Sequence, residues 1–420
     1  MQKLLLFILA ISWGGFSYAK QVVVCESCEV KTLTEAFSII SSGDEILLKE
    51  GVYKEHDLEV LVPFSLIGEG NAVIDGEMIG TILAVKTDSF VIDGITFRNV
   101  GQSYTKDFAA VLVVRSNHFE IRNNTFENVF FGMLVEKSHF GVIEHNYIWG
   151  IRKNEANSGN GVQLWHSSDM QVNNNEVHGM RDGIYFEFVD RAIIYGNLSY
   201  DNIRYGLHFM FSNNDEYHHN VFKNNGAGVA VMFSKKIIMH DNRFEFNWGA
   251  ASYGLLLKEI YDAEIYNNIF EQNTTGITTE GSTRINFTNN LFLRNGWAVK
   301  VTGGCYDNMF HGNDFSSNAF DLSFNGHLNG SSFDGNYWSE YTGYDLDRDK
   351  VGDIPYRPVK LFSYIVNRTP ETIVLLRSLF VDIINFSEKV SPVFTPDNLT
   401  DEIPMMKRPT VVIGKENFEL

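Results

Sequence analysis

Residues 194–222 read IYGNLSYDNIRYGLHFMFSNNDEYHHNVF. They hold two copies of one pattern, in which an apolar or aromatic residue is followed three positions later by Asn: Ile194 with Asn197, and Tyr217 with Asn220. The pattern recurs between residues 121 and 338, and most copies are 22 or 23 residues apart. Its asparagines are Asn124, Asn146, Asn175, Asn197, Asn220, Asn242, Asn268, Asn290, Asn313 and Asn336. Such a period predicts a repeat architecture rather than the two or three globular domains that 420 residues would otherwise suggest.

Short apolar strands with Asn and Gly at the corners, and no amphipathic helices between them, are typical of a β-solenoid with one continuous core. Asn tolerates corner dihedrals, and its amide can bond to the equivalent Asn one coil above. We therefore expect an all-β parallel β-helix over residues 20–340, in which these asparagines are structural. A second structural line follows five residues behind the first: Asn202, Asn225, Asn247, Asn273, Asn295 and Asn318.

Two longer steps in the repeat mark insertions. They lie at residues 153–160 and 248–252. Loops that leave one face of a solenoid often serve binding. Near the N-terminus, residues 32–41 predict a short helix that caps the open end of the core.

Residues 1–19 have the features of a secretory signal: Lys3, an apolar run over residues 4–11, and a small-x-small cleavage site that ends at Ala19. The mature chain is therefore expected outside the cytoplasm. No later stretch reaches about 18 uninterrupted apolar residues, so any membrane association should run through partners. The net charge of −18 argues against binding a nucleic-acid backbone.

The chain has three cysteines. Cys25 and Cys28, spaced C-x-x-C, favour a local disulfide at the cap, with a thiolate metal site as the alternative. Cys305 lies in a Gly-rich turn and is expected to be a spare small residue.

One strand of each middle coil begins at a Gly, after which the second and fourth residues should point outward. These positions form two ladders: Gln163, Tyr185, His208, Ala230 and Leu256, beside Trp165, Glu187, Met210, Met232 and Lys258. An exposed strip of such residues indicates that something covers it. One interpretation is the chain's own C-terminal tail. Another is a copper(I) site at His208, Met210 and Met232, because thioether sulfur and imidazole suit that ion. A third is docking of a protein partner on Trp165, Tyr185 and Glu187.

Residues 341–358 form an acidic turn in which Asp345, Asp347, Asp349 and Asp353 alternate with other residues. Alternation aims several oxygens at one point, as calcium requires, although Lys350 stands where an EF-hand loop needs Gly. The alternatives are a calcium loop and a hydrogen-bonded acidic turn.

Residues 359–420 depart from the repeat. Two short amphipathic helices are expected at residues 361–366 and 372–386, followed by a Pro-containing extended arm. Met405 and Met406 on that arm are candidates for partner docking or copper contact, beside the simpler interpretation of an exposed arm. The arm could fold back on the rod or reach a membrane partner.

Several motifs resemble the NosD family of periplasmic nitrous oxide reductase maturation proteins, from about residue 30 into the C-terminal helices. They are Gly183-Ile-Tyr-Phe-Glu-Phe, Arg204-Tyr-Gly-Leu-His-Phe-Met-Phe-Ser, Ala251-Ser-Tyr-Gly-Leu-Leu-Leu-Lys, Asn295-Gly-Trp-Ala-Val, Phe333-Asp-Gly-Asn-Tyr-Trp, Gly343-Tyr-Asp-Leu-Asp and Ile354-Pro-Tyr-Arg-Pro.

The resemblance implies a right-handed parallel β-helix of the pectin-lyase type, without sugar chemistry. It further implies a periplasmic, non-enzymatic subunit on an ABC-type complex of a membrane permease and an ATPase. Such a complex would take copper from a membrane-anchored chaperone and help to build the copper sites of apo nitrous oxide reductase. The resemblance assigns no role to Cys25 and Cys28 and no copper ligands.

Two other functions compete with this one. A polysaccharide lyase, hydrolase or epimerase would need a carboxylate cluster with a base on one face, and the middle coils offer Glu187 and Lys258 but no cluster of Asp. Fold analogy alone does not make an enzyme. A plain surface β-helix would have interchangeable repeats, whereas these coils carry individual motifs.

Overall fold

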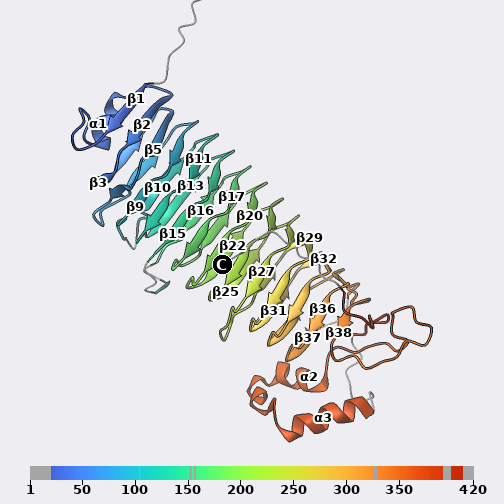
Figure 1. Ribbon diagram of the computed structural model, residues 1–420. Coiled ribbons are helices and arrows are strands. Elements are labelled where there is room, and N and C mark those ends of the chain that lie inside the picture. The colour runs from blue at the N-terminus through green and yellow to red at the C-terminus, as the bar shows by residue number, and fades with distance from the viewer. Residues whose placement is uncertain are drawn as a thin grey trace, which may run out of the picture.

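The computed structural model describes residues 20–103, 105–150, 154–155, 158–325, 329–390 and 399–409. Three parallel sheets wind around one core and form a straight rod, with the C-terminal helices packed at the far end (Figure 1). The predicted parallel β-helix is thereby confirmed.

Sheet A has 13 strands. They are β1 (Gln21–Val24), β2 (Asp44–Leu48), β5 (Phe64–Gly68), β8 (Val91–Asp93), β11 (Glu120–Arg122), β14 (Val142–Glu144), β17 (Gln171–Asn173), β20 (Ile193–Tyr195), β23 (Glu216–His218), β26 (Ile238–His240), β29 (Tyr261–Tyr266), β32 (Thr283–Thr288) and β35 (Met309–His311).

Sheet B also has 13 strands. They are β3 (Gly51–Lys54), β6 (Ala72–Asp75), β9 (Thr96–Arg98), β12 (Thr125–Glu127), β15 (Tyr147–Trp149), β18 (Glu176–His178), β21 (Leu198–Tyr200), β24 (Val221–Lys223), β27 (Arg243–Glu245), β30 (Ile269–Glu271), β33 (Leu291–Leu293), β36 (Asp314–Ser316) and β38 (Tyr337–Trp338).

Sheet C has 12 strands. They are β4 (Leu58–Val60), β7 (Leu83–Val85), β10 (Ala109–Val114), β13 (Phe131–Glu136), β16 (Val162–Trp165), β19 (Ile184–Glu187), β22 (Tyr205–Met210), β25 (Ala227–Met232), β28 (Leu255–Lys258), β31 (Thr275–Glu280), β34 (Trp297–Thr302) and β37 (Phe320–Asn325).

The asparagines of the repeat lie at the corner between sheets A and B, and they bond from coil to coil as expected. The Nδ2 of Asn220 donates to Oδ1 of Asn242 at 3.0 Å, and Asn242 donates in turn to Asn268 at 3.0 Å. The second line behaves alike, since Asn202 donates to Asn225 at 2.9 Å. Each amide also satisfies buried backbone groups, which are costly to leave unpaired.

Aromatic rings stack inside the rod over the same repeat. Phe244, Phe270, Phe292, Phe315 and Trp338 form one such column, with neighbouring ring centroids 4.2–5.1 Å apart. All five are at most 1% exposed. Burial of such large apolar side chains is the main force that holds successive coils together.

The N-terminal end of the core is covered by α1 (Leu33–Ile39), which is slightly shorter than the predicted helix. Thr32 caps it, because its side chain accepts a hydrogen bond from the backbone N–H of Glu35. Cys25 and Cys28 form the predicted local disulfide, and Cys305 is a free, buried thiol. The predicted signal over residues 1–19 lies outside the described residues.

After the last coil come α2 (Leu361–Arg368), the 3-10 helix η2 (Pro370–Leu375) and α3 (Leu379–Val390). The second predicted helix thus begins seven residues later than expected, because the segment that follows Pro370 forms a separate 3-10 turn. Phe362, Val366 and Val381 pack on Trp297 and Phe320 of sheet C. No helix among the described residues is long and apolar enough to span a membrane.

Candidate functional site

The two predicted ladders run along the outer side of sheet C in the expected register. Tyr185 pairs with His208 and His208 with Ala230, while Glu187, Met210 and Met232 are neighbours in the second ladder. Widely separated parts of the sequence thus form one strip, because equivalent residues of parallel coils lie about 4.8 Å apart.

His208 differs from the expectation of an exposed ladder, since only 5% of its surface is exposed. The rings of Tyr205 and Tyr185 lie 4.7 and 5.0 Å from its imidazole, and Tyr253, just after the second insertion, stacks on Tyr205. Its Nδ1 lies 3.3 Å from Oδ2 of Asp182. Its Nε2 has no hydrogen-bond partner among the described residues. His208 is therefore a covered imidazole with one nitrogen available to a ligand.

Asp182 lies in the coil before His208, contacts its imidazole and is only 1% exposed. Its other oxygen lies 3.6 Å from Nε of Arg204, and Arg204 also approaches Glu155 of the first insertion at 3.4 Å. A buried carboxylate needs such a partner because isolated charge is costly to bury. The sequence pattern did not predict the contact between Asp182 and His208, because the two residues belong to different coils.

The sulfur atoms lie at the edge of the same cluster. Tyr185 donates its hydroxyl hydrogen to Sδ of Met210 at 3.8 Å. Burial, together with the carboxylate of Glu187, raises the pKa of Tyr185 to about 12, so this hydroxyl stays protonated. Met210, Met232 and Trp165 are partly exposed, and Nζ of Lys137 lies 5.0 Å from the Trp165 ring. An unpartnered imidazole nitrogen, with two thioethers on the neighbouring ladder, offers donor types that suit copper(I).

The acidic turn brings three of its four predicted ligands together. Oxygens of Asp345, Asp347 and Asp349 lie within 4.8 Å of one another. Asp353 stands outside this group and accepts from the backbone N–H of Leu346 at 2.7 Å. The carboxylate of Asp345 accepts from three backbone N–H groups of the same turn. The geometry is compatible with both predicted alternatives, a calcium loop and a hydrogen-bonded turn.

The extended arm returns to the end of the rod. Residues 399–409 pair with the last coil and the acidic turn: the N–H of Met405 donates to Asn336 O of the coil and the N–H of Met406 donates to Lys350 O of the turn, both at 2.9 Å. Met405 and Met406 are partly buried there, so the expectation of a plain exposed arm does not hold for this segment. One interpretation of the sequence was that the C-terminal tail covers the sheet C ladder. The described part of the arm covers the last coil instead.

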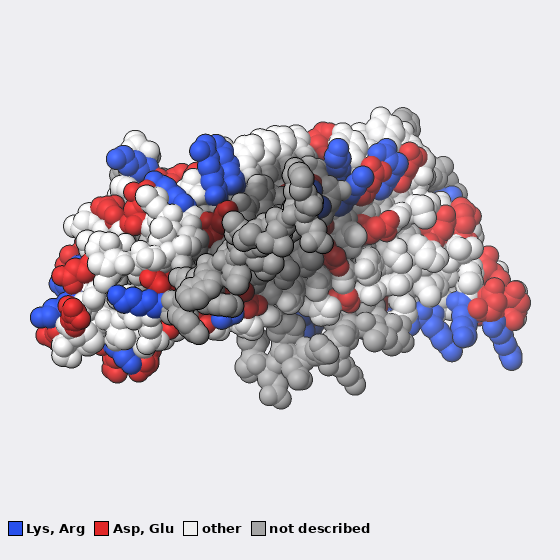
Figure 2. All heavy atoms as spheres, turned by 90° about the horizontal axis from the view of Figure 1, so that it is seen from above, with Lys and Arg blue, Asp and Glu red and all other residues white. Residues whose placement is uncertain are grey.

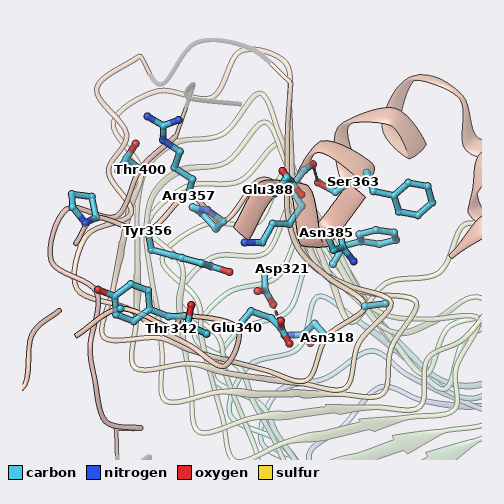
Figure 3. A pocket seen from close by; sticks show the side chains of 18 of the residues that line it. Asn318, Asp321, Glu340, Thr342, Tyr356, Arg357, Ser363, Asn385, Glu388 and Thr400 are labelled. Atoms are coloured by element: carbon cyan, nitrogen blue, oxygen red, sulfur yellow. Dashed lines mark hydrogen bonds between the residues drawn. The ribbon is translucent and has the colours of Figure 1, made fainter. Parts of the chain in front are cut away.

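A cavity of about 880 Å³ opens where the last coil meets α2, α3 and the acidic turn (Figure 3). Asp321, Tyr356 and Glu388 line it. Burial raises the pKa of Asp321 to about 7. The hydroxyl of Tyr356 and Oε2 of Glu388 have no hydrogen-bond partner among the described residues. No pattern in the sequence indicates this cavity, because its walls come from segments that lie far apart along the chain.

The outer face of α3 is apolar and uncovered in the described structure. Leu379, Ile383, Phe386 and Val390 recur at helical spacing along it, and each is 56–74% exposed. Val374 of η2 extends the strip and is 84% exposed. The opposite face of α3 packs against α2, and its Val381 joins the apolar cluster that connects α2 to the rod. A helix that is apolar on both faces is typical of a segment that is buried between two bodies.

Charged side chains of both signs are mixed along one face of the rod, and no continuous basic band crosses the described part of that face (Figure 2). This mixture of charges accompanies a net charge of −18 for the whole sequence.

A family model described as "Periplasmic copper-binding protein (NosD)" matches residues 150–343. Two proteins named "Probable ABC transporter binding protein NosD" are similar along most of the chain. The one from Stutzerimonas stutzeri is 28% identical over 85% of this chain and 86% of its own length. The one from Pseudomonas aeruginosa is 26% identical over 83% and 85%. This chain is similar to the NosD family along most of its length. The NosD family is described as periplasmic and copper-binding, and its named members as transporter-binding proteins.

A second model, "Right handed beta helix region", matches residues 17–177 and confirms the expected right-handed β-helix. Among solved structures, a family 28 exopolygalacturonase from Yersinia enterocolitica is 11% identical, with a TM-score of 0.52, over 76% of this chain and 78% of that one. The DFA-IIIase of Arthrobacter chlorophenolicus A6 is 12% identical, with a TM-score of 0.55, over 67% and 88%. At these identities the likeness shows the fold alone.

Proposed function

We propose that this chain is the periplasmic subunit of an ABC-type assembly that supplies copper during maturation of nitrous oxide reductase. The permease and ATPase subunits would carry it at the membrane, and a membrane-anchored copper chaperone and the apo-reductase would be its periplasmic partners. The partner ATPase would supply the energy, and this chain would hold and pass on the metal without catalysing a reaction.

The exposed apolar face of α3 is the observation that carries the proposal. Burial of an apolar side chain of this size stabilises a protein or complex by roughly 1.5–3 kcal/mol. A partner surface would gain this free energy by covering the exposed side chains of α3, which are Leu379, Ile383, Phe386 and Val390. The NosD relatives are named as transporter-binding proteins, so a membrane subunit of an ABC transporter is the occupant that we assign to this face.

The sheet C cluster is the place that we propose for copper(I). His208 offers an unpartnered Nε2, Asp182 orients its ring, and the thioethers of Met210 and Met232 follow on the neighbouring ladder. The position of His208 between Tyr185 and Tyr205 fits a transient cargo better than a polysaccharide, because a sugar ring could not reach an imidazole that is 5% exposed.

Copurification with the membrane partners tests the docking proposal. The full chain is expressed with the permease and ATPase subunits, and the amount retained on the tagged permease is measured. The substitution Phe386→Glu should reduce retention at least about tenfold, because a charge would be buried in an apolar interface. Leu61→Glu is the matched control, since Leu61 is 65% exposed at the other end of the rod. Equal retention of F386E and L61E would exclude α3 as the docking element.

A further inference from the structure

A second group of possible metal ligands lies on sheet A, on a different side of the rod from His208. Tyr195, His218, His240 and Tyr266 occupy equivalent places in four successive coils. Their rings form a stacked column with neighbouring centroids 4.8–5.2 Å apart. Stacking determines how the ring planes of His218 and His240 are oriented. The ring nitrogen atoms lie at the edge of the stack, where they can contact other groups.

His219 departs from the column and turns back toward it. It occupies the left-handed corner position, with φ at 56°, that Asn267 and Asn289 fill in later coils. Its ring stands at 88° to the ring of His218, and the two Nδ1 atoms are 2.9 Å apart. Two imidazole nitrogens therefore converge from adjacent residues, and both rings are only partly buried, so that an ion has access from solvent.

Carboxylates flank this pair. Asp241 holds the corner position one coil above His219, and its Oδ2 lies 2.6 Å from Nδ1 of His240. Glu216 lies 3.2 Å from the other nitrogen of His240. His240, which stacks on His218 one coil away, is thus fixed between the two acids. Two neutral imidazoles and two carboxylates together balance the charge of a divalent ion.

We infer that His218 and His219 bind copper(II) through their Nδ1 atoms, and that the carboxylates held by His240 supply negative charge beside this pair. Two nitrogens 2.9 Å apart, each about 2.0 Å from a metal, subtend an angle of about 90° at the ion. Tetragonal nitrogen and oxygen sites with such angles favour copper(II). The choice of metal rests on the proposed copper function, whereas the site lies apart from the His208 cluster and its thioethers.

The neighbouring coils supply substitutions that remove ligands and preserve the fold. His219→Asn places at the corner the residue that later coils already carry there, at Asn267 and Asn289. His218→Tyr continues the stack that Tyr195 and Tyr266 form on either side. His178→Tyr is the matched control, because His178 stacks on Tyr200 in sheet B at 4.8 Å.

The test titrates copper(II) into the purified full chain against a competing chelator and records electron paramagnetic resonance spectra. The wild type and H178Y should bind one equivalent with coupling to two imidazole nitrogens. H219N and H218Y should each bind more than about tenfold more weakly, because loss of even an indirect partner of a metal ligand costs about that much. Thermal unfolding should show the same midpoint for every variant, and H219N alone decides the question if H218Y fails to fold.

Unchanged copper(II) affinity in H219N and H218Y would overturn the inference and leave a simple hydrogen bond between two neutral rings. Loss of the spectrum in His208→Ala but not in H219N would overturn it as well. The docking proposal and the copper(II) site are tested independently. H219N should still copurify with the permease, and F386E should still bind copper(II).

Discussion

The indole Nε1 of Trp338 donates a hydrogen bond to Oδ2 of Asp401 at 2.8 Å, across 63 residues of sequence. Trp338 belongs to the last coil, and Asp401 belongs to the arm that returns after the C-terminal helices. The same carboxylate accepts from the backbone N–H groups of Gly335 and Asn336 at 2.9 and 3.0 Å. Asp401 therefore caps the open C-terminal end of the asparagine ladder.

Removing this cap should destabilise the rod. Asp401→Ala leaves several buried donors without an acceptor, and we expect a loss of about 3 kcal/mol or more in the free energy of unfolding. Asp401→Asn should lose less, because one acceptor oxygen remains. Urea unfolding measures both, with the exposed neighbour substitution Glu402→Ala as the control. A D401A curve that superimposes on that of E402A would show that the arm does not close the rod.

Asp215 should make stability depend on pH. It is 1% exposed, and burial holds its pKa well above the usual range. The folded chain therefore binds a proton more tightly than the unfolded chain. Stability on this account is highest below the usual Asp pKa of about 3.9 and falls as pH rises through the folded-state value.

Asp215→Asn should remove that dependence. Asn308 fills the equivalent place four coils later, where its Oδ1 accepts from the N–H of Ile285 and its Nδ2 donates to Ser282 O, both at 3.0 Å. The same pair of bonds in D215N should stabilise the chain by about 1 kcal/mol at pH 7.5. Thermal unfolding at several pH values checks this. A variant that is less stable than the wild type at pH 7.5 would contradict it.

Calcium should stiffen the acidic turn if its three clustered carboxylates act as ligands. With a dissociation constant typical of extracellular sites, about 5 mM calcium stabilises the chain by about 1–2 kcal/mol. The shift in thermal midpoint should exceed that produced by magnesium and should disappear in Asp347→Asn. A shift of equal size in D347N would favour the hydrogen-bonded turn.

The affinity of the chain for copper(I) should depend on the sheet C cluster. His208→Ala, and the pair Met210→Ala/Met232→Ala, should each weaken copper(I) binding by roughly tenfold or more in a competition titration. Met309→Ala is the control, since Met309 is 51% exposed on sheet A. The same affinity in all of these variants would remove the ladder as a copper site.

Much of the fold and of the candidate site follows from the repeat period of the sequence. Because equivalent residues of stacked coils are neighbours, spacings of 22 and 23 residues determine which asparagines bond and that His208, Met210 and Met232 share one strip. The alternation of inward and outward residues likewise placed Phe209 in the core. These contacts repeat one local geometry, so the sequence alone was sufficient to predict them.

Other features depended on segments that break the period. Tyr205 covers His208 and is itself stacked on Tyr253, which lies beside an insertion, and no repeat rule gives the path of such a loop. The apolar outer face of α3 is defined by tertiary packing, because the other face, with Val381, is covered by the cluster around α2. The convergence of His218 and His219 depends on ring rotation at one corner. Side-chain direction at irregular positions is decided by packing among parts distant in sequence, and for that reason only the tertiary structure determined it.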